Sequence, residues 1–341
     1  MALCFLLTTH GLDDVAAAEI TATPGLTLRG RGYRRLLIEG PADRIADLRL
    51  VDDAFALLAT WEAVPHTRAA LTDLPQRFSR IDPAPALAAL GSVRRINDAG
   101  PSGAFSLTVS FVGKRNWSGP ELKTTLAPVV AARLRRPYSE RDDEAVINVR
   151  VFIDHDTAHV GLRLARRPLQ DRAWKQAHQP GSLKPPVAAV LAFLAGAGPG
   201  RRVLDPCCGA GTILAESAAR GATIIGGDAH RDALAMARTN LPPGAVLAQW
   251  DACRLPLAAA AVDAVICNPP WGDQVAITAA PERFYRALAS ETARVLRPGG
   301  STVVLIDAPD GFVAPGLVER QRIAFSLAGR TPTILVLERR I

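Results

Sequence analysis

Two patterns of apolar and polar positions divide the chain near residue 186. From residue 196 onward, short apolar runs alternate with stretches of helical periodicity, which is typical of βαβ units and a parallel sheet. The apolar runs predict strands at 202–205, 223–228, 245–249, 262–267 and 301–306, and the periodic stretches predict helices at 211–220, 231–241 and 281–296. Two further β-like runs, 319–327 and 331–338, flank a short glycine-containing turn. We therefore expect five parallel strands closed by an antiparallel hairpin.

The first half of the chain mixes short strands with helices and predicts an α+β region. Strands are expected at 3–9, 34–39, 105–111, 146–153 and 159–164, and helices at 12–21, 42–48, 83–90 and 119–134. We predict two small units, 1–60 and 61–165, then a connector at 166–186 that is rich in proline. The domain at 187–341 would then begin with a buried alanine-rich helix within 186–198.

Length and composition favour a globular protein of several domains, with 341 residues, 48% apolar and 21% charged. No apolar run is long enough for a membrane span and no basic leader precedes the first residues, so we expect a cytoplasmic protein. Five cysteines without a Cys-x-x-Cys pair indicate reduced thiols and no metal site. The net charge of +7 favours a polyanionic partner. Residues 1–184 carry 25 basic and 20 acidic residues, so +5 of that charge lies there.

A glycine-rich turn follows the predicted strand at 202–205. Leu214 stands where a dinucleotide-binding fingerprint needs its third glycine, and the Lys-Ser/Thr pair of a phosphate loop is absent. S-adenosylmethionine has no phosphate, and a loop with Gly209 and Gly211 leaves room for its sulfonium and carboxylate end. Close apolar packing is the better interpretation of the nearby cysteines than a nucleophilic role. We expect this loop to bind S-adenosylmethionine.

Three aspartates lie at the ends of successive predicted strands. Asp205 can accept from the ammonium of the cofactor, Asp228 from its ribose hydroxyls, and Asp251 from its adenine amino group. Any one of them alone could cap a turn or a helix, but three in succession indicate a binding site. The predicted cofactor-binding residues are Asp205, Cys207, Cys208, Gly209, Gly211, Thr212, Asp228, Ala229, Asp251, Ala252 and Asn268.

The tetrapeptide Asn268, Pro269, Pro270 and Trp271 follows the fourth predicted strand. Two prolines fix the backbone and remove two N–H donors, so the Asn268 side-chain oxygen and the Pro269 carbonyl can accept from an amino group. Trp271 offers a face on which a base turned out of its helix can stack. Two acceptors increase electron density on an amino nitrogen whose lone pair is delocalised into its ring. The four residues are therefore predicted to be catalytic, in the methylation of an exocyclic amino group.

The motifs resemble those of a known family. Residues 205–216 are similar to the Asp-Pro-Phe-Cys-Gly-Ser-Gly-Thr-Ile-x-x-Glu loop of THUMP-domain RNA guanine-N2 methyltransferases, and residues 268–272 to their Asn-Pro-Pro-Tyr/Phe-Gly. Parts of the connector (166–169, 174–175 and 183–185) and the N-terminal stretch 8–15 also resemble these proteins. The sequence departs from the family at Cys207 and Trp271, and Trp174-Lys175 replaces Tyr-Arg.

The resemblance implies a Rossmann-like, seven-stranded class I methyltransferase domain at 187–341. It also implies a ferredoxin-like unit and a THUMP-like RNA-binding domain before it, and a guanosine of tRNA as the target. We expect a monomer. The residues proposed to contact RNA are Lys114, Arg115, Arg133, Arg135, Arg136, Arg163, Arg166, Arg167 and Lys175.

Several alternatives stay open at this point. The same tetrapeptide chemistry serves N2-guanine methylation of rRNA, N6-adenine methylation of RNA or DNA, and glutamine methylation in proteins. A protein of a different class, a non-catalytic RNA-binding protein that has kept the fold, would bind RNA without turnover.

Overall fold

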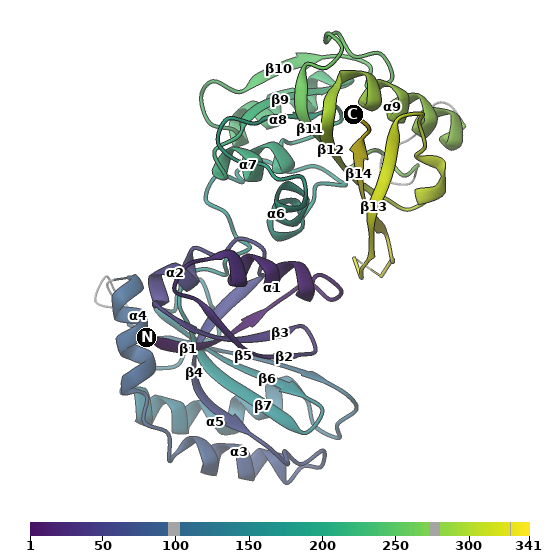
Figure 1. Ribbon diagram of the computed structural model, residues 1–341. Coiled ribbons are helices and arrows are strands. Elements are labelled where there is room, and N and C mark those ends of the chain that lie inside the picture. Colours follow the sequence, from purple (N-terminus) through teal and green to yellow (C-terminus); the bar gives the residue numbers. More distant parts are fainter. Residues whose placement is uncertain (95–102, 273–279, 328) are drawn as a thin grey trace. The chain divides into compact units, whose positions relative to one another are not determined.

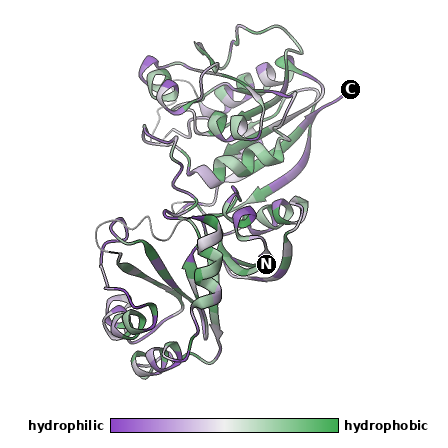
Figure 2. Ribbon diagram, turned by 90° about the vertical axis from the view of Figure 1, so that its left-hand side faces the viewer, coloured by the Kyte–Doolittle hydropathy of each residue, from purple (hydrophilic) through white to green (hydrophobic). Residues whose placement is uncertain are grey.

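The computed structural model describes residues 1–94, 103–272, 280–327 and 329–341. The chain forms two compact units, of which one comprises residues 1–8 and 13–169 and the other residues 9–12 and 170–341 (Figure 1). Hydrophobic residues gather on the central strands of each unit (Figure 2). In the part of the chain that the structure describes, no helix has both the length and the apolar character needed to span a bilayer.

The first unit is built on one sheet, with seven strands among the described residues, in the order β2-β3-β1-β4-β7-β6-β5. β1 pairs antiparallel with β3 on one side and with β4 on the other, and β2 pairs antiparallel with β3. Together with α1 and α2, this is the split βαβ arrangement of a ferredoxin-like unit. Its elements are β1 (Ala2–Leu7), α1 (Asp13–Ala22), β2 (Thr27–Gly32), β3 (Arg35–Gly40), α2 (Ala42–Ala46), β4 (Asp53–Trp61), α3 (Ala70–Phe78), α4 (Ala84–Val93), β5 (Phe105–Val112), α5 (Gly119–Leu134), β6 (Ile147–Asp154) and β7 (Thr157–Arg163).

The boundary predicted near residue 60 lies inside β4. This strand pairs with β1 on one side and with β7 on the other, so the sheet continues across the boundary. Beyond it, β5 and β6 pair in parallel and are joined through α5, and β6 and β7 form a hairpin. The assignment of residues 61–165 to a THUMP-like domain stays a prediction.

The second unit contains the predicted α/β sheet. Its described strands follow the order β10-β9-β8-β11-β12-β14-β13, with the first five parallel and β14 antiparallel to both of its neighbours. All six residues of β11 are buried, as expected for a central parallel strand covered on both faces. Its elements are α6 (Pro185–Leu194), β8 (Arg202–Asp205), α7 (Thr212–Ala219), β9 (Thr223–Asp228), α8 (Arg231–Asn240), β10 (Val246–Gln249), β11 (Val262–Cys267), α9 (Pro281–Val295), β12 (Leu296–Ile306), the 3-10 helix η1 (Pro309–Gly311), β13 (Leu317–Ala324) and β14 (Thr333–Arg339).

This arrangement confirms the predicted seven-stranded fold of the C-terminal domain. The order reverses between β8 and β11, where the connections leave in opposite directions. Ligands of open α/β sheets bind outside the carboxyl ends of the strands at such a switch point. The fold therefore directs attention to the loops that follow β8, β9, β10 and β11.

Candidate active site

Four predicted site residues lie in a row along the carboxyl edge of the second sheet. Asp205 ends β8, Asp228 ends β9, Asp251 follows β10 and Asn268 follows β11. The pairing of β10 with β9, of β9 with β8 and of β8 with β11 makes these strands consecutive neighbours. Because parallel strands end at the same edge, the fold brings together side chains that are far apart in sequence.

The glycine-rich turn after β8 requires its glycines. Gly209 and Gly211 have φ values of 52° and 80°, a region that residues with a Cβ rarely adopt. A Cβ at Gly209 would lie 2.8 Å from the side-chain nitrogen of Gln179, and a Cβ at Gly211 would lie 3.1 Å from Leu241. Thr212, also buried, begins α7 directly after the turn. The two glycines are therefore needed for the conformation of this turn and for its close packing against Gln179 and Leu241.

The Asp228 carboxylate is fixed by two backbone donors. One oxygen accepts from the Gly209 N–H at 2.9 Å and the other from the His230 N–H at 3.0 Å. A carboxylate has about four lone-pair positions, so it can accept from ligand hydroxyls as well. Asp228 thus joins the glycine-rich loop to the start of α8 and keeps acceptor positions for a ligand.

Asp205 and Asp251 differ sharply in environment. Asp205 is 1% exposed and accepts from the Cys207 N–H at 3.1 Å. Burial, with a smaller effect of nearby Asp228, raises the pKa of Asp205 well above its ordinary value. Asp251 is exposed and accepts from the Cys253 N–H at 2.8 Å. Asp205 can therefore contact a ligand group that is shielded from water, and Asp251 can contact a group at the exposed edge of the site.

Only one of the two polar atoms of the Asn268 side-chain amide has a hydrogen-bond partner among the described residues. Its Nδ2 donates to the Gly181 carbonyl at 3.4 Å, whereas its Oδ1 is buried and has no hydrogen-bond partner among the described residues. Buried acceptors are nearly always paired, so an unpaired one calls for an explanation. An amino group of a substrate would supply the missing donor.

The rest of the tetrapeptide is held by neighbouring elements. The Tyr285 hydroxyl, on α9, donates to the Pro270 carbonyl at 2.9 Å. The Trp271 indole N–H donates to the Leu305 carbonyl of β12 at 3.3 Å, which sets the direction of its ring. Pro269 is buried. The sequence did not predict the role of Tyr285, because nothing in the local pattern of α9 distinguishes it from a core aromatic residue.

The cysteines near this edge are unsuited to nucleophilic chemistry. Cys208 and Cys267 are buried, and burial raises the pKa of both thiols. Cys267 also has a hydrogen bond with the partly buried Cys207, and Cys208 packs among apolar side chains of α7 and α8. A thiol that stays protonated is a weak nucleophile, so these residues fill space around the loop.

The connector supplies residues that the sequence did not identify. Residues 170–184 belong to the second unit, and there Gln179 lies over Gly209 while Gly181 accepts from Asn268. The Arg172 guanidinium contacts the fully buried carboxylate of Glu216 at 3.0 Å. Lys175 donates to the Leu183 carbonyl at 2.5 Å, and burial lowers the pKa of its ammonium. Lys175 is thus engaged within the connector.

Arg163, one of the residues expected to contact RNA, is buried in the first unit. Arg163 has only 5% of its side chain exposed, and it pairs with Asp53 at 2.7 Å and with Asp142 at 2.6 Å. The prediction for Arg163 was wrong, because β7 ends at this residue with its side chain turned inward onto Asp53 and Asp142.

The other predicted basic residues fall into two groups. Arg115, Arg133 and Arg136 donate to backbone carbonyls of the first unit, and Arg115 also lies 5.2 Å from the centre of the Trp117 ring. The side chains that are exposed without a described partner are the stronger candidates for RNA: Lys114, Arg135, Arg166 and Arg167. RNA contact by any of these residues stays a prediction.

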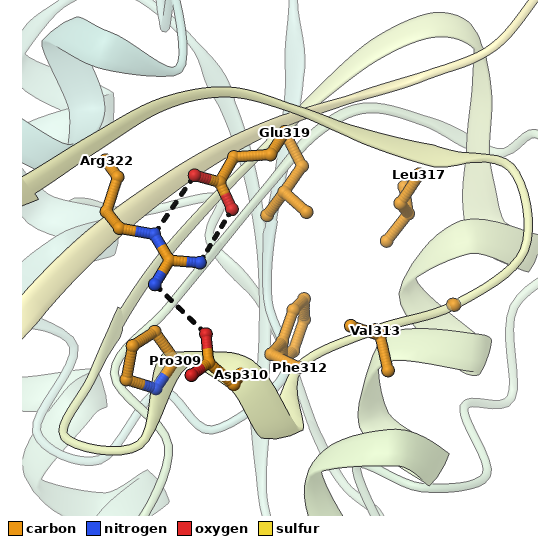
Figure 3. A pocket seen from close by; sticks show the side chains of 9 residues that line it. Pro309, Asp310, Phe312, Val313, Leu317, Glu319 and Arg322 are labelled. Carbon is orange, nitrogen blue, oxygen red and sulfur yellow. Dashed lines mark hydrogen bonds and ion pairs between the residues drawn. The ribbon is translucent and has the colours of Figure 1, made fainter.

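A pocket of about 380 Å³ lies elsewhere in the second unit (Figure 3). η1, β13 and β14 form its walls, with Phe312 and Leu337 among its apolar lining residues. Arg322 is held there by Glu319 at 2.9 Å and Asp310 at 3.0 Å (Figure 3). None of the predicted site residues lines this pocket, so it is distinct from the row at the carboxyl edge.

The sheet order, the glycine-rich loop after β8 and the Asn-Pro-Pro-Trp sequence after β11 define a class I methyltransferase. Residues 172–314 match the family described as RMKL-like, methyltransferase domain. The structure is similar to that of TrmN from Thermus thermophilus, with a TM-score of 0.77, 25% identity and coverage of 99% of this chain and 100% of that one. It also shares its fold with SMU.472, crystallised in complex with SAH, at a TM-score of 0.72 and 16% identity.

Curated relatives identify the family within this class. The chain is 31% identical to the tRNA (guanine(6)-N2)-methyltransferase of Thermus thermophilus over 77% of this chain and 80% of that protein. It is 29% identical to the mouse U6 snRNA (guanine-N(2))-methyltransferase THUMPD2 over 52% of this chain, but spans only 34% of that protein. The chain belongs to the family of RNA guanine-N2 methyltransferases.

Proposed function

We propose that this enzyme transfers a methyl group from S-adenosylmethionine to the exocyclic N2 amino group of a guanosine in tRNA. The observation that carries the proposal is the buried Oδ1 of Asn268 at the switch point of the sheet, which has no hydrogen-bond partner among the described residues. The similarity to a tRNA guanine-N2-methyltransferase over most of both chains favours guanosine and tRNA. The expected cytoplasmic location and monomeric state stay predictions.

The residues along the carboxyl edge fit the cofactor in chemical terms. Gly209 and Gly211 shape a tight turn beside the buried carboxyl of Asp205, where the amino-acid end of the cofactor is proposed to lie. Asp228 has acceptor capacity for ribose hydroxyls, and the exposed Asp251 is available to an adenine amino group. Ala229 and Ala252 follow those two aspartates and offer no bulk to obstruct a planar base. When bound, S-adenosylmethionine supplies an activated methyl group on a sulfonium leaving group.

The chain's own contribution to methyl transfer is to orient and polarise the target nitrogen. Asn268 Oδ1 accepts one N–H of the amino group, which increases electron density on a nitrogen otherwise delocalised into the purine ring. The Pro269 carbonyl is proposed as the second acceptor. Trp271, anchored at Leu305, stacks on the flipped base and aligns it. Alignment and a preorganised acceptor lower the barrier without a covalent intermediate on the protein.

The decisive test is product identification. The purified protein is incubated with isotopically labelled S-adenosylmethionine and, in separate reactions, with unmodified tRNA or unmodified rRNA. The nucleosides are then separated by chromatography and identified by mass spectrometry. The proposal expects label in N2-methylguanosine. Label in N6-methyladenosine, label in rRNA but not in tRNA, or RNA binding without any labelled nucleoside would contradict it, and these outcomes identify the alternatives left open by the sequence.

A further inference from the structure

Asn240, the last residue of α8, has every hydrogen-bonding position of its amide in use. Its Oδ1 accepts from the N–H groups of Gln176 and Ala177, both at 2.9 Å. Its Nδ2 donates to the Ala177 carbonyl at 2.7 Å and to the Ala210 carbonyl at 2.8 Å. The residue is only 2% exposed. A simple polar residue at a helix end faces solvent, so this degree of burial and pairing indicates another role.

The partners of Asn240 belong to two separate parts of the site. Ala210 lies between Gly209 and Gly211 in the glycine-rich loop. Gln176 and Ala177 lie in the connector, a few residues before Gln179 and Gly181. One side chain therefore ties the connector to the loop on which the cofactor is proposed to bind.

The same connector segment reaches the catalytic asparagine. The Gly181 carbonyl accepts from Asn268 Nδ2, and an amide has only one oxygen and one nitrogen. The hydrogen bond from Nδ2 to the Gly181 carbonyl therefore fixes the orientation of the amide, so that Oδ1 is the atom available to accept from the substrate. If this connector segment moved, the Asn268 amide could rotate. Its Nδ2, a hydrogen-bond donor, would then face the target amino group, which is also a donor.

We propose that Asn240 is a positioning residue, which holds connector residues 176–182 against the glycine-rich loop so that Gly181 orients the Asn268 amide. Only an amide side chain can both accept from two N–H groups and donate to two carbonyls at this position. The link to methyl transfer rests on the proposed function, whereas the attachment of the connector to the loop does not.

The test compares Asn240→Asp and Asn240→Ser with Thr239→Ala as a matched control. Aspartate keeps the acceptors for the connector N–H groups but faces the Ala177 and Ala210 carbonyls without a donor, and serine is a milder change. Thr239 is the preceding residue, is exposed, and its hydroxyl donates only within α8, to the Ala235 carbonyl at 3.3 Å. Three quantities are measured: trypsin cleavage of the folded protein after Arg172 and Lys175, the affinity for S-adenosylmethionine by calorimetry, and the single-turnover methylation rate at saturating cofactor.

For Asn240→Asp we expect cleavage within the connector to be at least about 10-fold faster, cofactor affinity about 10-fold weaker, and the single-turnover rate about 10- to 100-fold lower, since a buried carbonyl loses its donor. Asn240→Ser should fall between aspartate and wild type, and Thr239→Ala should match wild type. If both Asn240 variants melt at a lower temperature yet show wild-type cleavage and wild-type turnover well below that temperature, Asn240 is merely structural and the proposal is overturned. If cleavage and cofactor affinity change as expected but wild type produces no N2-methylguanosine, the proposed function fails and the positioning role stands.

Discussion

Replacing Asn268 by alanine separates the effect of this asparagine on stability from its effect on catalysis. The substitution removes Oδ1, a buried acceptor without a partner among the described residues, and Nδ2, whose single described bond to Gly181 is 3.4 Å long. Burying an unsatisfied acceptor costs about 1–3 kcal/mol, and a bond of that length returns at most about 1 kcal/mol. After allowance for a small cavity, the free energy of unfolding should stay within about 1 kcal/mol of wild type or rise.

Activity should respond very differently. If Oδ1 accepts from the target amino group in the transition state, its loss resembles removal of one preorganised hydrogen bond, which costs about 10²-fold in kcat, or about 2.7 kcal/mol. Asn268→Asp retains an acceptor but cannot donate to Gly181, so it should retain more activity than alanine and less than wild type. Asn116→Ala, a change of the same type at an exposed asparagine, should have no effect.

The assay is single-turnover methylation of tRNA at saturating cofactor, with thermal and urea unfolding of the same preparations. A single-turnover rate for Asn268→Ala within about 5-fold of wild type would refute the catalytic role of Oδ1. A loss of activity that is matched by a loss of several kcal/mol in stability would also refute the reasoning, because it would make the residue structural.

Three further predictions follow from the contacts described above. Arg163→Gln should lower the free energy of unfolding by about 3–5 kcal/mol in urea titrations, because it leaves buried Asp53 without its ion-pair partner. Arg167→Ala, at an exposed position, should leave the free energy of unfolding unchanged. It should reduce the slope of log binding constant against log salt concentration for tRNA by about one. Tyr285→Phe should cost about 1 kcal/mol in the same titrations and lower kcat, because a hydroxyl whose pKa burial raises to about 12 remains a donor to Pro270 in wild type. The raised pKa of Asp205 means that the folded wild type loses stability as the pH rises above about 4, the ordinary pKa of an aspartate. The stability gained by Asp205→Asn should therefore be larger at pH 8 than at pH 5. An equal gain at both pH values would contradict the burial of a charged carboxylate.

The C-terminal sheet could be predicted from sequence because burial and motif agree there. Central parallel strands are covered on both faces, so apolar residues dominate their buried parts, as at 203–204 in β8 and 264–267 in β11. The residues that follow these runs carry the motifs. The row from Asp251 to Asn268 then follows from strand order alone. The position of Tyr285 does not, because it depends on how α9 packs against the tetrapeptide.

The first half was less predictable for identifiable reasons. β2 reads Thr-Leu-Arg-Gly-Arg-Gly, which has little apolar content because it is an edge strand paired only with β3. β4 was missed although it is the strand that unites the sheet, since its apolar run lacks clear alternation. The prediction for Arg163 was wrong because a basic residue at the end of a strand looks the same in sequence whether it faces solvent or ion pairs with the carboxylates of Asp53 and Asp142.

Asn240 and Asn268 show where sequence reasoning reaches its limit at the site itself. Both are amides in the second unit, but Asn240 makes four hydrogen bonds, whereas the Asn268 oxygen has no partner in the described part of the chain. The two prolines after Asn268 indicated its role, because they remove local donors that would otherwise satisfy its oxygen. No comparable signal marks Asn240, whose partners are backbone atoms distant in sequence. We thus propose that the two asparagines serve the same reaction. Asn240 holds the connector in place through four hydrogen bonds, and Asn268 keeps its oxygen available to the substrate.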